Sequence, residues 1–467
     1  MLRKSLLVLG PMSFAVVALL ACEDDSVPDA VGTIDAGNVN VIPPPPPTTG
    51  ASGDSGMADD GAVVTAAVSV TVTGTLLNGV NVIFHDASGA VLDKVQTGAD
   101  GKATSSAAGI AMVTALQNRD QLHRAVTWTN VARGDNLTLG EIASTASAGT
   151  YTVTVPQLLG NRSGYRAYSG SCASAPATTS EASAISLTSP RCIGASPSAL
   201  LASALVVTDG KSHFSFTKTG PAAPFGGSNI PATLGAWALP STTSVAIANN
   251  MTATAVTSNV GEIANRLLYM PVAAQTVTTE PVSFDYPTGF ADALQAQVGV
   301  TVGPGINKFI VKRFDPGPSV AFDYGQLLGT MTGSTVDATN ASRPILAWGG
   351  DSTANTDGGL VSLAFSLPSD RGTYVWTFVV PPGTTTVTAP ALPADVPFAP
   401  AADAGASVTF MRPFVWFIEA DAFDSPASFR QQQGATFGPF TVASLVQQIP
   451  VLSANGTFRS TGFVSLR

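Results

Sequence analysis

The chain has 467 residues with a formal net charge of −9, and charged side chains make up only 11% of it. An acidic chain with scattered lysines and arginines cannot neutralise a run of phosphates, which argues against nucleic acid as a partner. The 45 glycines and 33 prolines indicate many short strands joined by turns. At this length we expect about two to four domains. The sequence therefore predicts an all-β protein with tandem β-sandwich domains.

Residues 1–21 have the pattern of an export signal. Arg3 and Lys4 form a positively charged start, and Leu6–Leu20 is a run of about fifteen residues that are almost all apolar. A transmembrane helix needs about twenty such residues, so this run is short for a membrane span. The segment predicts a cleaved signal peptide and an exported mature chain.

The signal ends in Leu19-Leu20-Ala21-Cys22, which resembles the lipobox of bacterial lipoproteins. The resemblance implies that Cys22 is the first mature residue and carries acyl chains, so that the membrane is a partner through this lipid anchor. Several chains on one residue anchor stably, whereas a single chain is marginal. The implied location is the bacterial cell envelope, with the outer membrane favoured and its periplasmic or surface face left open. The alternative is an ordinary cleaved signal with a chance cysteine.

Residues 22–62 predict a disordered linker. They include the proline run Pro43–Pro47 and only scattered apolar residues without an aromatic, so they cannot bury enough surface to fold. The proline run is stiff and the Gly/Ser part is flexible. The segment Gly53–Gly56 looks like the nucleophile segment of trypsin-like proteases. A serine nucleophile needs a rigid base and oxyanion donors, however, and a disordered tether offers neither.

Residues 63–147 predict the first β-sandwich. Val68, Val70 and Val72 alternate with polar residues, as in a half-buried strand. Asn78-Gly79 and Asp100-Gly101 predict turns. The stretch 74–107 resembles carboxypeptidase-regulatory-like and bacterial Ig-like β-sandwiches. The residues that carry this resemblance are Gly74, Gly79, Val80, Val82, Thr97, Asp100, Gly101 and Lys102. It implies an Ig-like or prealbumin-like fold that serves as a spacer or a binding platform.

Residues 148–341 predict a β-rich domain with little helix. Short apolar runs predict strands at 151–155, 205–208, 213–217, 244–248, 267–273, 277–284 and 309–314. The segment Asp292–Val298 is expected to form a turn or two of helix. The expected outcome is one large sandwich or jelly roll.

The three cysteines are Cys22, Cys172 and Cys192. If Cys22 is lipidated, the other two remain as an even pair in an oxidising compartment, which predicts a Cys172–Cys192 disulfide. Closing a loop of about twenty residues would stabilise the fold by about 3 kcal/mol in the chain-entropy model. The competing interpretation is a pair of metal-binding thiols, which is a poor zinc site without a histidine partner.

Residues 342–467 predict a third β-sandwich. The alternation in 374–380 places one aromatic-rich face toward a core, and 414–418 is apolar on both faces, which is typical of a central strand. A tryptophan on an early strand and a threonine-rich strand that runs into Leu392-Pro393 make this region weakly similar to fibronectin type III domains. No clean internal repeat is visible in the chain.

The sequence offers no catalytic constellation. His85, His123 and His213 lie in different segments, and no metalloprotease, nucleophile-elbow, Walker A or Rossmann motif is present. His123 with Asp135 and some serine is the remaining arrangement for a divergent hydrolase. The sequence therefore predicts a protein without enzymatic activity and without a cofactor.

Two groups of oxygen-bearing side chains are weak calcium candidates. Asp351, Asn355 and Asp357 crowd a Gly-rich loop before a strand, and hard cations prefer several oxygen ligands on such loops. A second group, at the end of another strand, is Glu419, Asp421 and Asp424. Neither group matches a known loop template. The alternative, which we favour, is that these side chains bind their own backbone.

The five tryptophans could form a sugar-stacking platform if they were exposed and coplanar. They are Trp128, Trp237, Trp348, Trp376 and Trp416. Two of them, Trp376 and Trp416, lie in apolar strand patterns, which favours packing in the core.

The function expected from the sequence is that of an envelope or cell-surface lipoprotein with a structural, adhesive or binding role. Its partners would be the membrane and an envelope polymer, glycan or protein. The alternatives are a carbohydrate- or polymer-binding surface protein and a divergent hydrolase.

Overall fold

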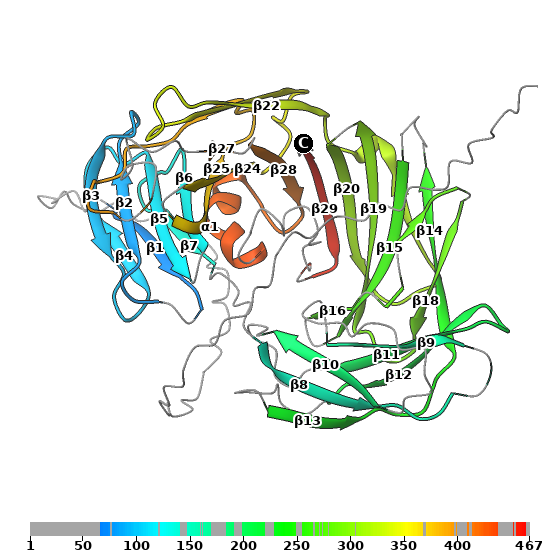
Figure 1. The fold of residues 1–467 in the computed structure, drawn as a ribbon. Coiled ribbons are helices and arrows are strands. Elements are labelled where there is room, and N and C mark those ends of the chain that lie inside the picture. The colour runs from blue at the N-terminus through cyan, green and yellow to red at the C-terminus, as the bar shows by residue number, and fades with distance from the viewer. Residues whose placement is uncertain are drawn as a thin grey trace, which may run out of the picture. The chain divides into compact units, whose positions relative to one another are not determined.

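The computed structural model confirms the all-β class, with strands in several packed sheets (Figure 1). It describes residues 66–74, 77–119, 122–140, 147–158, 160, 162–169, 184–190, 199–219, 228–248, 255–264, 267–269, 271–272, 274–278, 280–303, 305–367, 370–396, 398, 409–410, 413–437, 452 and 454–463. Within these ranges, the helical elements are α1 (Pro426–Phe437) and the short 3-10 helix η1 (Tyr324–Gln326). No described helix has the length and apolar character that crossing a membrane requires.

The first module is a sandwich of two sheets. Its strands are β1 (Val68–Val72), β2 (Asn81–His85), β3 (Val91–Gln96), β4 (Lys102–Ser105), β5 (Met112–Arg119), β6 (Leu122–Trp128) and β7 (Asn136–Leu139). One sheet has the order β4-β1-β7, in which β1 is antiparallel to β4 and parallel to β7. The opposite sheet has the order β3-β2-β5-β6. The strand and turns predicted at 68–72, 78–79 and 100–101 are confirmed.

The second module repeats this topology. Its strands are β8 (Ser147–Thr154), β9 (Arg162–Tyr168), β10 (Ala184–Pro190), β11 (Leu200–Val206), β12 (Lys211–Thr217) and β13 (Ser228–Thr233). The first strand, β8, is again antiparallel to β10 and parallel to the last strand, β13. The opposite sheet is β9-β11-β12, which matches β2-β5-β6 of the first module.

The third module has the same arrangement. Its strands are β14 (Pro240–Ala248), β15 (Ala255–Ala264), β16 (Leu267–Tyr269), β17 (Gln275–Thr276), β18 (Val282–Pro287), β19 (Ala293–Gly303), β20 (Ile306–Phe314) and β21 (Ser319–Asp323). Its sheets are β18-β14-β21 and β16-β15-β19-β20, and β14 is parallel to the last strand, β21. The chain therefore contains a structural repeat that leaves no clean trace in the sequence.

The C-terminal region joins the first and third modules. Its strands are β22 (Met331–Asp337), β23 (Ile345–Gly350), β24 (Gly358–Leu367), β25 (Asp370–Val380), β26 (Thr386–Thr388), β27 (Thr409–Phe410), β28 (Phe414–Ala420) and β29 (Gly456–Phe463). β25 pairs in parallel with β6, and β29 pairs antiparallel with β20. These ladders make one 14-stranded sheet that runs through all three regions predicted from the sequence (Figure 1).

Strand β28 lies in the middle of the long sheet and is apolar on both faces, as its sequence predicted. Phe414, Trp416 and Ile418 pack in a core that β1, β2, β5 and β7 share. Val415 and Phe417 pack in a second core, on the other face, under the small sheet β22-β23-β26. The predicted aromatic face of β25 lies in that second core as well.

In each module, one edge strand is covered by another part of the chain: β6 in the first module, β12 in the second and β20 in the third. β6 is paired by β25, and β20 is paired by β29, whereas β12 is covered by a connecting segment and a carboxylate. The backbones of Phe214 and Ala238 exchange hydrogen bonds, and Gly235 N donates to Phe216 O. Asp285 Oδ2 accepts from the N–H of Ser212. Such coverage removes the unpaired N–H and C=O groups that would otherwise recruit another chain.

One expectation about helices was wrong, and one helix was not expected. Asp292–Val298 does not form helical turns, because Leu294, Ala296, Val298 and Val300 alternate into a core as part of β19. This period of two outweighs the helix propensity of the segment. Helix α1 was not expected, although Ser425 before Pro426 is a recognisable helix start, and Ser425 Oγ accepts from Ser428 N.

Replacement of Gly462 by alanine should destabilise the long sheet. A Cβ at this position of β29 would overlap the indole ring of Trp416, which stacks on Phe414 and Phe309. Overpacking of this kind costs about 1–3 kcal/mol. Urea denaturation of Gly462→Ala should show that loss. Gly333→Ala is the matched control, because a Cβ at Gly333 meets open space, and equal stability of the two variants would contradict the prediction.

Candidate functional site

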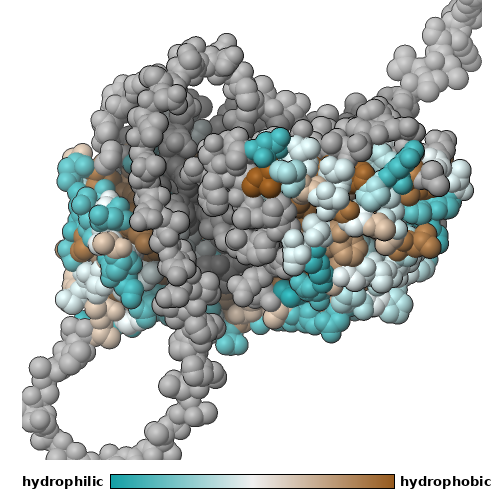
Figure 2. All heavy atoms as spheres, turned by 90° about the horizontal axis from the view of Figure 1, so that it is seen from below, coloured by the Kyte–Doolittle hydropathy of each residue, from teal (hydrophilic) through white to brown (hydrophobic). Residues whose placement is uncertain are grey.

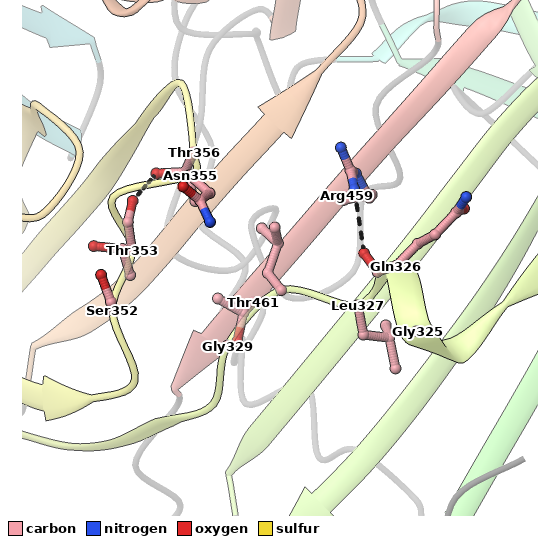
Figure 3. A pocket seen from close by; sticks show the side chains of 11 residues that line it. Gly325, Gln326, Leu327, Gly329, Ser352, Thr353, Asn355, Thr356, Arg459 and Thr461 are labelled. Atoms are coloured by element: carbon pink, nitrogen blue, oxygen red, sulfur yellow. Dashed lines mark hydrogen bonds between the residues drawn. The ribbon is translucent and has the colours of Figure 1, made fainter. Parts of the chain in front are cut away.

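A pocket lies where β29 of the C-terminal region meets the third module, and we call it the seam pocket. It has a volume of about 270 Å³. Its walls are Gly325–Gly329 and the loop residues Ser352, Thr353, Asn355 and Thr356, and its floor is Arg459 and Thr461. Figure 3 shows the side chains of these segments around one opening.

Backbone contacts fix both walls of the seam pocket. Asp323 caps η1 by accepting a hydrogen bond from Gly325 N at 2.8 Å. On the other wall, the Thr356 hydroxyl donates to Thr353 O at 2.7 Å, and Thr353 Oγ1 accepts from Gly383 N at 3.1 Å. These local bonds hold the loop in one shape, because each satisfies a group that the turn leaves unpaired.

The floor comes from alternate residues of β29, which therefore point to the same face of the sheet. Arg459 is ion-paired with Glu419 on β28, with Nη2 to Oε2 at 2.5 Å, and its Nη1 reaches Gln326 O at 3.5 Å. Thr461 is fully buried, and its Oγ1 has no hydrogen-bond partner among the described residues. In the long sheet, Thr461 pairs with Lys308 of β20 on one side and with Phe417 of β28 on the other.

Burial and nearby charges shift the pKa values of two residues beside the pocket. The pKa of Asp357 is raised to about 6, mainly by burial and to a smaller extent by Glu419 and Asp421, whereas the hydrogen bond from Ala420 N and the charge of Arg459 oppose the rise. Burial lowers the pKa of Lys308, and the carboxylate of Asp351 partly opposes this effect.

The first group of calcium candidates is tied to separate backbone positions. Asp351 Oδ2 accepts from Thr330 N at 2.7 Å, and Asp357 Oδ2 accepts from Ala420 N at 2.8 Å. Asn355 lies on the rim of the seam pocket. Within the described ranges, no group of three or more histidine, cysteine, aspartate or glutamate side chains could hold a metal ion.

The second group lies beside the first, which sequence reasoning did not foresee. Glu419 binds Arg459, and Asp421 Oδ2 accepts from Thr457 N at 2.8 Å. Both carboxylates are close enough to Asp357 to raise its pKa. Asp357 of the first group and Glu419 of the second therefore both lie near Arg459, which belongs to β29, a third segment of the chain.

The histidines lie in different surroundings. His85 is fully buried and begins a chain of hydrogen bonds through Thr114 and Thr127 to Trp376 Nε1, with steps of 3.0, 2.9 and 2.8 Å. His123 stacks on Tyr374 with ring centroids 4.3 Å apart. His213 pairs with Asp209 at 2.9 Å.

Asp135, the carboxylate considered for a hydrolase, serves the fold. Its Oδ2 binds Arg430 Nη2 of α1 at 2.8 Å, and its Oδ1 accepts from Gln431 Nε2 at 2.9 Å. Ala132 N also donates to Oδ2. The carboxylate therefore links helix α1 to the loop before β7 through an ion pair and hydrogen bonds.

Four of the five tryptophans are buried, including Trp376 and Trp416, for which the strand patterns predicted core packing. Trp128 and Trp376 are fully buried, and Trp348 and Trp416 are 7% exposed. Trp237 is half-buried, stacks on Tyr165 and donates from Nε1 to Pro156 O. These residues therefore do not supply a solvent-facing stacking platform.

Exposed apolar side chains are spread over several elements, and two of them, Val91 and Leu92, are neighbours in β3. The large ones are Val91, Leu92, Leu205, Val207, Leu239, Val302 and Ile345. On the face drawn in Figure 2, hydrophilic and hydrophobic described residues are interspersed. Scattered apolar residues of this kind are normal on protein surfaces and do not indicate a docking patch.

Several predicted features lie outside the described residues. They are the signal peptide 1–21, the linker 22–62 with its GDSG segment, the lipidation residue Cys22 and the pair Cys172 and Cys192. The acylation and the disulfide stay predictions.

Comparison with protein-family models and with curated proteins gives no match. Among solved structures, the chain has a faint likeness to the N-terminal four Ig domains of Dscam1 isoform 7.44. The likeness has a TM-score of 0.12 and 6% sequence identity, and it covers 72% of this chain and 87% of that one. A likeness at this level carries no argument about fold or function.

The protein should lose stability as the pH falls from 6.5 toward 4, with His85 as one cause. Burial lowers the pKa of His85 from 6.5 to about 4, so between these values the unfolded chain binds a proton that the folded chain excludes. At pH 5 this difference amounts to about 2 kcal/mol. Urea denaturation at pH 7.5 and pH 5 should show that His85→Gln loses less stability than the parent protein. Equal losses would contradict this assignment.

Asp357 should have the opposite dependence on pH. Because its folded pKa of about 6 lies above the usual value, its stabilising contribution is full at low pH and is lost as the pH rises through 6. Asp357→Asn keeps an oxygen for Ala420 N and removes the charge. The variant should gain stability over the parent at pH 7.5 and lose that advantage at pH 4.5, measured by thermal unfolding. A variant that is less stable at both pH values would disprove this account.

Proposed function

We propose that the protein is a lipid-anchored protein of the bacterial envelope, with a structural or binding role and no enzymatic activity. The observation that carries the proposal is the order of parts along one chain. An export signal ending in Leu19–Cys22 precedes the Pro/Gly linker, and the β-sandwich modules follow.

The modular body supports this proposal. Three sandwiches of one topology follow one another, and the C-terminal strands join the first and the third into a continuous sheet. In each sandwich one edge strand is covered, and a covered edge does not recruit other chains, which suits a body exposed outside a membrane. A linker of stiff and flexible parts would keep this body clear of the bilayer.

The contacts of the histidine and aspartate side chains support a role without enzymatic activity. Asp135 binds Arg430, His85 belongs to a buried chain of hydrogen bonds, and His213 pairs with Asp209. Each of these contacts stabilises the fold, whereas a hydrolase needs a base that can reach a nucleophile and a substrate.

Cys22→Ala should abolish the anchor. In cells fed radioactive palmitate, the parent protein should be labelled and recovered with membranes, whereas the variant should be unlabelled and recovered in the aqueous fraction. The double variant Cys172→Ala, Cys192→Ala is the matched control, because it removes the other thiols and keeps the acylation residue. Equal labelling of parent and Cys22→Ala would refute the proposal.

A further inference from the structure

We propose that the seam pocket binds one uncharged, hydroxyl-rich unit of monosaccharide size, either free or at the end of a glycan. The inference rests on the binding role proposed above and names its ligand class. Its test does not depend on the anchor, so the two proposals can fail separately.

The pocket lining has the chemistry that hydroxyl groups require. Its polar side chains are hydroxyls and amides, with one guanidinium. They are Gln326, Ser352, Thr353, Asn355, Thr356, Arg459 and Thr461. Hydroxyls and amides both donate and accept hydrogen bonds, so they match a ligand whose own hydroxyls do the same. Figure 3 shows that these side chains come from both walls and from the floor.

The balance of charge favours a neutral ligand. Arg459 is the only charged residue that lines the pocket within the described ranges, and Glu419 neutralises it at 2.5 Å. Lys308, next to Thr461 in the register, lies near the carboxylate of Asp351. An anion would need an uncompensated cation here, whereas a neutral hydroxyl can use the remaining N–H of Arg459 without breaking its ion pair.

Thr461 supplies a polar group that the described residues leave unused. Its side chain is fully buried on the floor, and its Oγ1 has no hydrogen-bond partner among them. A buried hydroxyl without a partner costs free energy, so such groups call for an explanation. Because this oxygen is closed to solvent, a ligand hydroxyl in the seam pocket would complete the bond after a rotation of the Thr461 side chain.

The size and the rigidity of the pocket limit the ligand to one ring. Its volume of about 270 Å³ lies just below the roughly 300–1,000 Å³ of pockets for drug-sized ligands. Leu327 and Leu328 add apolar contact for the C–H groups of a sugar ring. The hydrogen bonds that fix both walls mean that little order has to be gained on binding, which favours affinity.

The test uses the full-length protein in a detergent without a sugar head group, because an alkyl maltoside would compete. Titration calorimetry and saturation-transfer NMR would probe glucose, galactose, mannose and N-acetylglucosamine, with oligosaccharides ending in the same units to represent a glycan end. Inorganic phosphate and glucuronate are the charged probes. We expect at least one neutral sugar to bind and both charged probes to bind more weakly.

Variants of pocket residues then test whether the sugar binds in the seam pocket. Asn355→Ala and Gln326→Ala remove exposed rim amides and should each weaken binding by about 2- to 10-fold, the range for one hydrogen bond. Thr461→Val should weaken binding at least as much, and thermal unfolding would check its fold. Gln432→Ala, on the exposed side of α1, is the matched control and should bind like the parent. Absence of neutral-sugar binding, tighter binding of a charged probe, or unchanged binding in all three pocket variants would overturn the proposal.

Discussion

The need to cover one edge strand in each module is the constraint on which the rest of this structure depends. In each module one sheet ends in a strand whose outer N–H and C=O groups have no partner among the strands of that module. This strand is β6 in the first module, β12 in the second and β20 in the third. β25 covers β6 and β29 covers β20, whereas Ala238, Gly235 and Asp285 cover β12. An exposed edge recruits other chains, so a body made of repeated sandwiches must solve this problem once in each module.

The two solutions have different consequences. At β12 a few backbone bonds and one carboxylate suffice, and the sheet ends there. At β6 and β20 whole strands are added, so two modules become parts of one sheet with the C-terminal strands between them. This joint carries cores on both faces of β28, because residues on its two sides pack against different neighbouring sheets.

The seam pocket follows from that joint. On the face where Arg459 and Thr461 lie, one core is covered by β22-β23-β26 and another by β18-β14-β21, and the polar floor lies next to both. The half-buried charge of Arg459 is tolerated in such a place because the ion pair with Glu419 satisfies its guanidinium. The same joint partly buries Asp357 beside Glu419 and Asp421. Burial is the main cause of its raised pKa, and the two carboxylates add smaller contributions.

The sequence by itself determined the β class, the turns at 78–79 and 100–101 and the two apolar faces of β28, because these depend on alternation and turn chemistry within a few residues. It also determined the core packing of Trp376 and Trp416, and it predicts the anchor at Cys22. Only the tertiary structure decided that three modules share one topology, that β25 pairs with β6, and that Asp357, Glu419 and Arg459 meet. These features depend on which strands pair across distant parts of the chain. The alternation within a strand sets which face is buried, but the same alternation is compatible with many different strand partners.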